Sequence, residues 1–236
     1  KLYSMSSRPT LFIIYIFMLT SCLSKNETNN SEWVDLSNDS SFKDWHTFQS
    51  DSVIGWKIEN GVYVLYPNEG DKNNGLVSNK SYSSFILSLE WKVEENGNSG
   101  IFWGVNESSE FSVPYLSAPE IQVIDDNIYG TKDTTNFHHM NGALYDMVSP
   151  SELFANATGE WNHYLIEINY KNNIANVDLN GKRSISFPLS GDKWEELIYN
   201  SKFKDWKGFA KLKSGPIALQ DHGTKVYYRN IKIKEL

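Results

Sequence analysis

The sequence contains a single cysteine, Cys22, among its 236 residues. One thiol cannot form a disulfide within the chain, so the folded part must be held together by its hydrophobic core. Positive charge is also scarce, because 22 Lys and Arg stand against 29 Asp and Glu and give a net charge of −7. Binding of nucleic acid calls for a basic patch or stripe. We therefore expect no nucleic-acid partner.

No hydrophobic run in the sequence is long enough to cross a bilayer comfortably. The apolar run over residues 11–19 has the length of a signal-peptide core. It leads into Leu19-Thr20-Ser21-Cys22, which resembles the lipobox of bacterial lipoproteins, where the cysteine takes the lipid. The alternative is an ordinary secretory signal with an incidental cysteine.

The lipobox resemblance implies a signal peptide over residues 1–22 and lipidation of Cys22. The polar residues 23–31 lack periodicity and are typical of a flexible tether. We expect one folded domain over residues 32–236. We also expect it to lie in the bacterial cell envelope, at the periplasmic or the cell-surface side, with the lipid as its only membrane contact.

Signals for helices are few, and most of the remaining chain predicts short strands. Apolar and polar residues alternate, with the period of a half-buried strand, in four stretches. They are residues 85–93, 164–170, 175–179, which ends at the turn Asn180-Gly181, and 226–233. One helix is expected near residues 192–198, with Asp192 and Glu195 spaced as in a capping box, and a short turn over 151–154. This pattern predicts an all-β fold of two stacked antiparallel sheets, a sandwich or jelly roll, with one or two short helices.

Aromatic residues make up 14% of the sequence and include eight Trp. They can fill the core, or they can bind sugars, because the apolar face of a pyranose ring stacks on an aromatic ring. Composition alone leaves both interpretations open.

The most informative stretch runs from Pro119 to Asp126. If it is a strand, Ile121 and Val123 point into the core, while Glu120 and Gln122 share the opposite face. A carboxylate beside an amide can bind sugar hydroxyls, hold a metal or move a proton. The alternative is an ordinary strand face in contact with solvent.

Two further stretches carry candidate site residues. Small residues next to Tyr145 and Asp146 would let a ligand approach the backbone, and the preceding His138-His139 reads as a pair in a surface loop. The segment 211–223 begins at Lys211, and its strand ends on Gln220, Asp221 and His222. There Asp221 could orient His222 as a general acid or base, or the three residues could form a hydrated turn.

The stretch 96–103 has two interpretations. It could be a plain hairpin loop, or a rim on which Asn98 and the indole of Trp103 hold a sugar.

The order of several short motifs is more specific than any one of them. The motifs are Trp-Lys-Ile-Glu-Asn-Gly-Val (56–62), Glu-Trp-Lys-Val (90–93), Gly-Asn-Ser-Gly-Ile-Phe (97–102), Pro-Glu-Ile-Gln-Val-Ile-Asp-Asp (119–126), Gly-Ala-Leu-Tyr-Asp (142–146), Gly-Glu-Trp-Asn (159–162), Leu-Asn-Gly-Lys (179–182), Gln-Asp-His-Gly (220–223) and the C-terminal 229–236. Together they resemble the 3-keto-disaccharide hydrolase family over residues 32–236.

The resemblance implies a concanavalin A-like jelly roll that acts on glycosides with a ketone at carbon 3. The positions that match the family's polar pocket are Glu120, Gln122, Tyr145, Asp146, Lys211, Gln220, Asp221 and His222. One position departs from the pattern, because many members read Ile-Phe-Tyr-Arg where this chain has Ile101-Phe102-Trp103-Gly104.

A ketone at carbon 3 acidifies the hydrogen on carbon 2, so a modest base can start an elimination that expels the glycosidic oxygen. Such a route needs a base, an acid and a group that stabilises the enolate. Either Glu120 or His222 could be the base, and Lys211 or a divalent metal could stabilise the enolate, although no ligand spacing demonstrates a metal.

We therefore predict an enzyme that cleaves 3-keto-glycosides or oligosaccharides. The expected catalytic residues are Glu120, His222 and Asp146, and the expected substrate-binding residues are Gln122, Tyr145, Lys211, Gln220, Asp221, Asn98 and Trp103. A non-catalytic carbohydrate-binding module on the same fold is the main alternative. An ordinary glycosidase that pairs Glu120 with another carboxylate is the second.

Overall fold

A computed structural model describes residues 32–37, 40–67, 74–129 and 137–236. The expected signal peptide, the lipidated Cys22 and the tether lie outside the described residues. Within the described ranges, no helix is long and apolar enough to cross a membrane.

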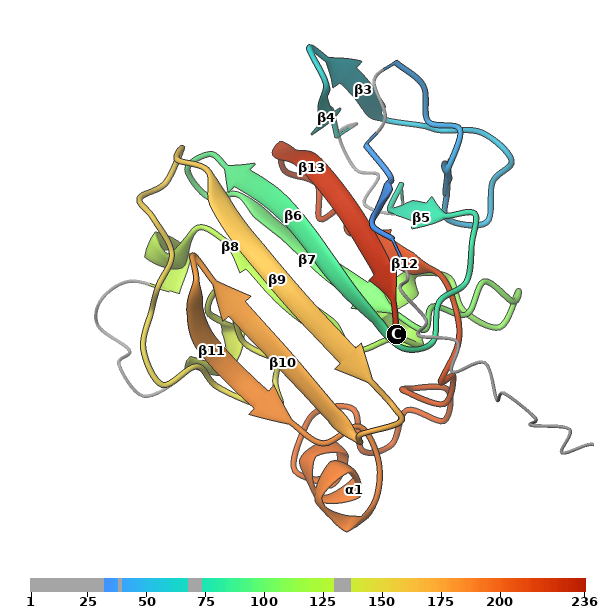
Figure 1. Ribbon diagram of the computed structural model, residues 1–236, viewed down its shortest axis with the longest axis vertical. Coiled ribbons are helices and arrows are strands. Elements are labelled where there is room, and N and C mark those ends of the chain that lie inside the picture. Colours follow the sequence, from blue (N-terminus) through green and yellow to red (C-terminus); the bar gives the residue numbers. More distant parts are fainter. Residues whose placement is uncertain (1–31, 38–39, 68–73, 130–136) are drawn as a thin grey trace, which may run out of the picture. The chain divides into compact units, whose positions relative to one another are not determined.

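The alternating stretches form the larger of two antiparallel sheets, which has eight strands (Figure 1). Its order is β11-β10-β9-β6-β13-β4-β3, and β1 pairs with β13. The strands are β1 Val34–Asp35, β3 Trp56–Glu59, β4 Val62–Leu65, β6 Phe85–Val93, β9 Asn162–Asn169, β10 Ile174–Leu179, β11 Lys182–Phe187 and β13 Val226–Glu235.

The smaller sheet has five strands in the order β2-β5-β12-β7-β8. They are β2 Trp45–Thr47, β5 Leu76–Ser78, β7 Asn98–Trp103, β8 Glu120–Ile124 and β12 Ile217–Leu219. In Figure 1 this sheet lies behind the larger one, and β8 forms one of its edges. Two stacked antiparallel sheets confirm the predicted all-β sandwich.

The core lies between the two sheets because each long strand buries every second side chain. Along β6 the alternation is complete, with Phe85, Leu87, Leu89, Trp91 and Val93 buried. The inward residues of the smaller sheet pack in the same cluster, among them Ile121, Val123, Ile217 and Leu219. The predicted direction of Ile121 and Val123 is therefore confirmed.

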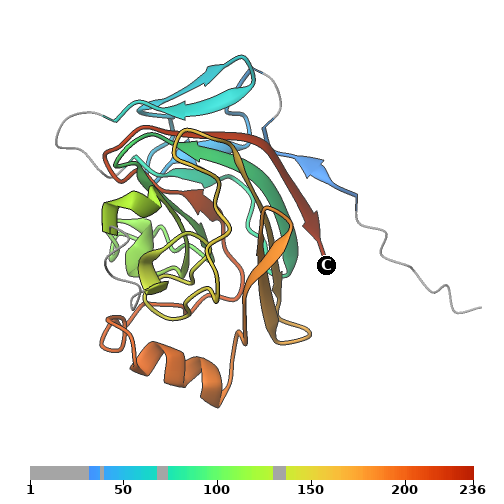
Figure 2. The same cartoon turned by 90° about the vertical axis from the view of Figure 1, so that its left-hand side faces the viewer.

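The predicted turn and helix both form, but the predicted cap does not. Asn180 and Gly181 have φ values of 51° and 77° and close the hairpin between β10 and β11, as expected of this dipeptide. Helix α1, Asp192–Tyr199, lies at the end of the sandwich shown at the bottom of Figure 2. Its N-cap is Gly191, and no side chain caps it, so the expected capping box is wrong.

The other helical segments are single 3-10 turns. They are η1 Pro114–Leu116, η2 Asp126–Tyr129 and η3 Phe137–His139. Residues 151–154 contain only a bend and no helix.

The outer face of the smaller sheet changes from apolar to polar along one row of paired residues. Across the strands, His46 pairs with Val77, Val77 with Ala218, Ala218 with Phe102, and Phe102 with Glu120. The middle of this row belongs to a small hydrophobic cluster that loop residues cover. The row ends at the edge strand β8. Glu120 therefore lies next to the part of the sheet face that the loop residues cover.

Candidate active site

The predicted polar face of β8 lines a hollow of about 230 Å³ on the outer side of the smaller sheet. We call it the first hollow. It draws residues from β7, β8, the end of β12 and three loops. Its lining consists of Asn98, Tyr115, Glu120, Gln122, Tyr145, Lys202, Phe203, Gln220 and His222.

Glu120 is the carboxylic acid of this hollow, and its pKa is strongly raised. Its side chain is only 8% exposed, and burial raises the pKa of its carboxyl to about 8, although the nearby Lys202 lowers it. No hydrogen bond from a described residue offsets this loss of solvation. The pKa therefore lies near neutrality, where a carboxyl group can both accept and return a proton.

A glycine makes room for this carboxyl. Gly100 faces Gln122 across the β7–β8 pairing. A Cβ atom on Gly100 would lie 2.0 Å from Oε1 of Glu120, so any larger residue would occupy the place of the carboxylate. Gly100 thus fixes where Glu120 can lie.

Two buried glutamines border Glu120. Gln122 is 1% exposed and donates from Nε2 to the carbonyl of His139 at 3.1 Å. The backbone N–H of Gln220 donates to the carbonyl of Gly100 at 2.9 Å. The side-chain carbonyl oxygens of both glutamines are buried without a hydrogen-bond partner among the described residues. Buried acceptors are normally paired, which makes these two atoms candidates for ligand contacts.

Tyr145 forms one wall of the first hollow, and its ring contacts both a cation and an imidazole ring. Its backbone N–H donates to the carbonyl of Glu120 at 2.9 Å. Nζ of Lys202 lies 4.1 Å from the centre of its ring, and the imidazole of His139 stacks on that ring at 4.5 Å. His139 is therefore part of the site's support, which corrects its assignment to a surface loop.

Asp146 connects these two neighbours of Tyr145. Its Oδ1 lies 3.0 Å from Nε2 of His139, and its Oδ2 accepts from the backbone N–H of Lys202 at 2.7 Å. Asp146 does not line the first hollow. The structure therefore gives it the position of a bracing residue, whereas the sequence suggested a catalytic one.

The sequence analysis missed Lys202, which follows α1. Burial lowers the pKa of its ammonium, while Glu120 and Asp146 oppose that shift. Lys202 is the cation that lines the first hollow among the described residues. Its distance from Glu120 along the chain leaves no local pattern that would have identified it.

Two predicted site residues lie elsewhere. Lys211 lines a different cavity, together with Trp194 and Glu195 of α1. Trp103 is 3% exposed and packs in the core, 6.2 Å from the ring of Phe187. Neither residue lines the first hollow, so the structure does not bring them together with the other predicted site residues.

At Gly104, where the sequence departs from the expected family pattern, the backbone of this chain leaves no room for a side chain. Its φ is 66°, and a Cβ atom at this position would lie 2.7 Å from the carbonyl oxygen of Leu212. A side chain would therefore be strained and would also clash with the backbone of the 211–215 segment. The positive charge of the hollow comes from Lys202 instead.

A second hollow of about 260 Å³ adjoins the first. It is lined by Gly75, Val113, Pro114, Tyr115, Gln220, Asp221 and His222. Three of these residues, Tyr115, Gln220 and His222, line both hollows. The predicted cluster 220–222 is thus brought to the site, with Asp221 on the side of the second hollow.

The described residues contain no group of three or more His, Cys, Asp or Glu side chains that could hold a metal ion.

A buried acid, a cation and two buried amides thus lie together on the outer face of the smaller sheet. The model of the 3-keto-alpha-glucoside-1,2-lyase-like domain family matches residues 32–234, and the chain belongs to this family. A protein of Bacteroides thetaiotaomicron named 3-keto-disaccharide hydrolase is 32% identical in an alignment 220 positions long, which covers 83% of this chain and 75% of that protein.

Solved structures agree with the fold. A glycosyl hydrolase-like protein of Parabacteroides distasonis superimposes with a TM-score of 0.79 at 31% identity, over 86% of this chain and 94% of the other. The carbohydrate-binding module CBM66 of Bacillus subtilis matches with a TM-score of 0.51 at 12% identity, over 84% and 99%. The second match shows a shared fold only.

Proposed function

We propose that this protein cleaves glycosides whose sugar carries a ketone at carbon 3, by elimination across carbons 2 and 1 followed by hydration. Membership of the family and the named relative support a sugar-active hydrolase. The observation that carries the finer proposal is the buried carboxyl of Glu120, whose pKa is about 8, in a hollow that also contains the ammonium of Lys202.

Glu120 is the base in this proposal. It takes the proton from carbon 2, and the electrons of that bond form an enolate whose negative charge lies on the oxygen at carbon 3. Lys202 stabilises this charge, since a preorganised cation in a partly desolvated site is effective there. Lys202 replaces Lys211 in the role that the sequence suggested.

His222 is the acid. The enolate collapses to a double bond between carbons 1 and 2, the carbon 1–oxygen bond breaks, and the leaving oxygen takes the proton of His222. Water then adds to carbon 1 and gives one proton to His222, while Glu120, whose carboxyl proton has exchanged with solvent by then, delivers a proton to carbon 2. The products are the 3-keto sugar and the free alcohol, and both side chains regain their starting states.

An ordinary glycosidase fits this hollow less well. Such enzymes use two carboxyl groups separated by roughly 5–9.5 Å on either side of the scissile bond. Glu120 is the one carboxylic acid that lines the first hollow within the described ranges. Asp146 is engaged with His139 and the backbone of Lys202, and Asp221 lies on the side of the second hollow, where its Oδ1 accepts from the N–H of Gly223. Elimination needs one base, which this arrangement supplies.

The experiment compares 3-keto-glycosides with their unoxidised parents in deuterated water. Elimination predicts cleavage of the keto substrates alone, with deuterium at carbon 2 of the sugar product. Cleavage of the parent glycosides without deuterium uptake would favour the glycosidase alternative. Binding without cleavage or exchange would favour a carbohydrate-binding module.

We further propose that the protein is exported and anchored through a lipid on Cys22. The lipobox-like Leu19-Thr20-Ser21-Cys22 after an apolar run supports this proposal.

A further inference from the structure

A third hollow, of about 400 Å³, has walls of its own. One wall comes from the segment between β7 and β8, and the other comes from the segment that follows α1. Its lining consists of Glu110, Phe111, Leu116, Trp206, Lys207 and Gly208. None of these residues lines the first or the second hollow. The proposed elimination therefore makes no use of the third hollow.

The third hollow continues from the first because the same two segments line both. Tyr115 and Phe203 line the first hollow, and Leu116 and Trp206, which follow them closely in the chain, line the third. The ring centres of Tyr115 and Trp206 lie 6.2 Å apart, and Tyr115 is 41% exposed. These two neighbouring rings thus lead from the first hollow into the third.

Trp206 is held in place by two rings on which it packs. Its indole meets the rings of Phe203 and Phe209 edge-on, with centre-to-centre distances of 5.0 and 6.4 Å. Phe203 and Phe209 are buried and stack on each other at 4.0 Å. Trp206 itself is partly exposed. An indole that is already fixed offers its apolar surface to a sugar at little cost in side-chain entropy.

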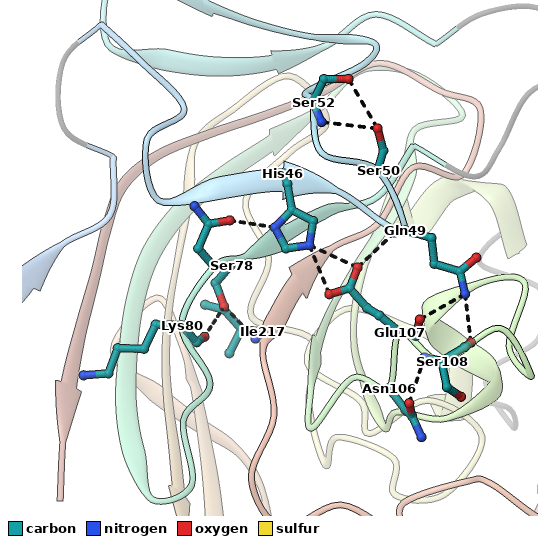
Figure 3. Close-up of polar contacts among 11 residues, drawn as sticks. His46, Gln49, Ser50, Ser52, Ser78, Lys80, Asn106, Glu107, Ser108 and Ile217 are labelled. Atoms are coloured by element: carbon teal, nitrogen blue, oxygen red, sulfur yellow. Dashed lines mark hydrogen bonds and ion pairs between the residues drawn. The ribbon is translucent and has the colours of Figure 1, made fainter.

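The opposite wall is fastened to β2 by a polar network (Figure 3). Nε2 of Gln49 donates to the carbonyl of Phe111 at 2.7 Å, and the backbone N–H of Gln49 donates to Oε1 of Glu107 at 2.9 Å. The carboxylate of Glu107 also lies 3.0 Å from Nε2 of His46, a residue of β2, and Figure 3 shows Gln49 and His46 converging on it. A Cβ atom on Gly208 would lie 2.2 Å from the ring of Phe111, so the two walls meet at this glycine.

The third hollow also carries polar groups. Glu110 and Lys207 are exposed and come from opposite walls. A carboxylate accepts hydrogen bonds from hydroxyl groups, and an ammonium donates to them. Together with the apolar surface of Trp206 and Phe111, they fit a pyranose ring, which has apolar faces and hydroxyls around its edge.

From this continuity we infer that the third hollow binds a sugar unit beyond the two that flank the cleaved bond. The preferred substrate is thus a 3-keto-oligosaccharide of three or more units. The inference rests on the proposed function. The 3-keto ring lies over Glu120 in the first hollow, the chain runs past Tyr115, and a later unit stacks on Trp206, where Glu110 and Lys207 bind its hydroxyls.

Two variants remove the proposed contacts and leave Glu120, Lys202 and His222 in place. Trp206→Leu removes the indole but keeps an apolar side chain against its two ring neighbours. The double variant Glu110→Ala with Lys207→Ala removes only exposed side chains, so its folding is not at risk. Lys204→Ala is the matched control, because Lys204 is an exposed lysine of the same segment that does not line the third hollow.

Each protein is assayed with gluco-oligosaccharides of two, three and four units, in α-linked and β-linked series, that carry the ketone on the terminal non-reducing ring. In one of the series we expect the KM of wild-type protein to fall by about tenfold between two units and four. Its kcat should change little, because the added contact lies away from the reacting atoms. Lys204→Ala should keep this gain with chain length, whereas Trp206→Leu and the double variant should each lose most of it.

Two results would overturn the inference. If wild-type protein cleaves the disaccharides but its KM does not fall with chain length in either series, or if the gain survives in both variants, the third hollow binds no unit of the substrate, while the proposed function stands. If wild-type protein cleaves none of the oligosaccharides, the proposed function itself is wrong, and this inference falls with it.

Discussion

Replacing Glu120 by Gln tests the site most directly because it keeps the shape of the side chain and removes the proton acceptor. The structure predicts two separate effects, one on stability and one on turnover. Both originate from the same cause, the burial that raises the pKa of this carboxyl to about 8.

The effect on stability depends on pH. In the unfolded chain Glu120 loses its proton near its ordinary pKa of 4.5, whereas the folded protein retains it until about pH 8. Between these values the folded state binds more protons than the unfolded state, so its stability falls as pH rises. At about 1.4 kcal/mol per pH unit, the loss approaches about 5 kcal/mol above pH 8.

Glu120→Gln removes this dependence. Wild type and variant should therefore have similar free energies of unfolding near pH 4.5, and the variant should become the more stable of the two as pH rises toward 8. Denaturant titrations at several pH values measure this difference. Glu196→Gln, on the exposed face of α1, is the matched control and should follow wild type.

The same substitution should lower turnover, although it raises the stability of the protein. If ionised Glu120 is the base and protonated His222 is the acid, wild-type kcat/KM rises about tenfold per pH unit at low pH, where Glu120 must still ionise, and falls at high pH, where His222 has lost its proton. The Gln variant should lose about 10²–10⁴-fold in kcat while still binding substrate. A wild-type profile without a rising limb at low pH, or a variant with near-normal kcat, would refute the assignment of Glu120 as the base.

Four shorter predictions concern two neighbours of Glu120, the lysine outside the first hollow and the expected lipid anchor. Gly100→Ala should displace the carboxylate of Glu120 and reduce kcat about as much as Glu120→Gln, with folding checked by circular dichroism. Lys202→Met should raise the pKa of Glu120, since the Lys202 ammonium lowers it, and should move the rising limb of the pH–rate profile to higher pH while kcat falls. Lys211→Ala should leave kcat/KM within about twofold of wild type, because Lys211 lines another cavity. Mass spectrometry of native protein should find a lipid on Cys22, and Cys22→Ser should release the protein from the membrane fraction; unmodified Cys22 in membrane-extracted protein would contradict this.

The sequence was sufficient for the part of the site that lies on a regular strand. Along β8 the alternation of Ile121 and Val123 with Glu120 and Gln122 predicts which side chains share a face, because the period of a strand is two. The same rule could have placed Trp103 in the core, since it has the parity of Ile101 on β7. That signal was present in the sequence and was not used.

Residues on irregular segments could not be placed in this way. Lys202 follows α1, and Lys211 follows a series of turns nine residues later. Both are lysines near polar motifs, and only the path of the backbone decides which of them reaches Glu120. The brace of His139 on Tyr145 likewise depends on Asp146, whose φ of 61° turns the chain back toward His139.

The state of Glu120 also bears on the choice between an enzyme and a binding module. A carboxylate that only binds sugar hydroxyls acts as an acceptor, and it is best kept ionised by solvent or by hydrogen-bond donors. Glu120 has neither: it is 8% exposed, and no hydrogen bond from a described residue reaches its oxygens. The fold therefore keeps this group protonated near neutral pH, because its ionised form has a high electrostatic energy in this buried position. While it is protonated, the group offers a hydrogen-bond donor to a sugar; once ionised, it is a stronger base than an exposed carboxylate, and a base is what proton removal from carbon 2 requires.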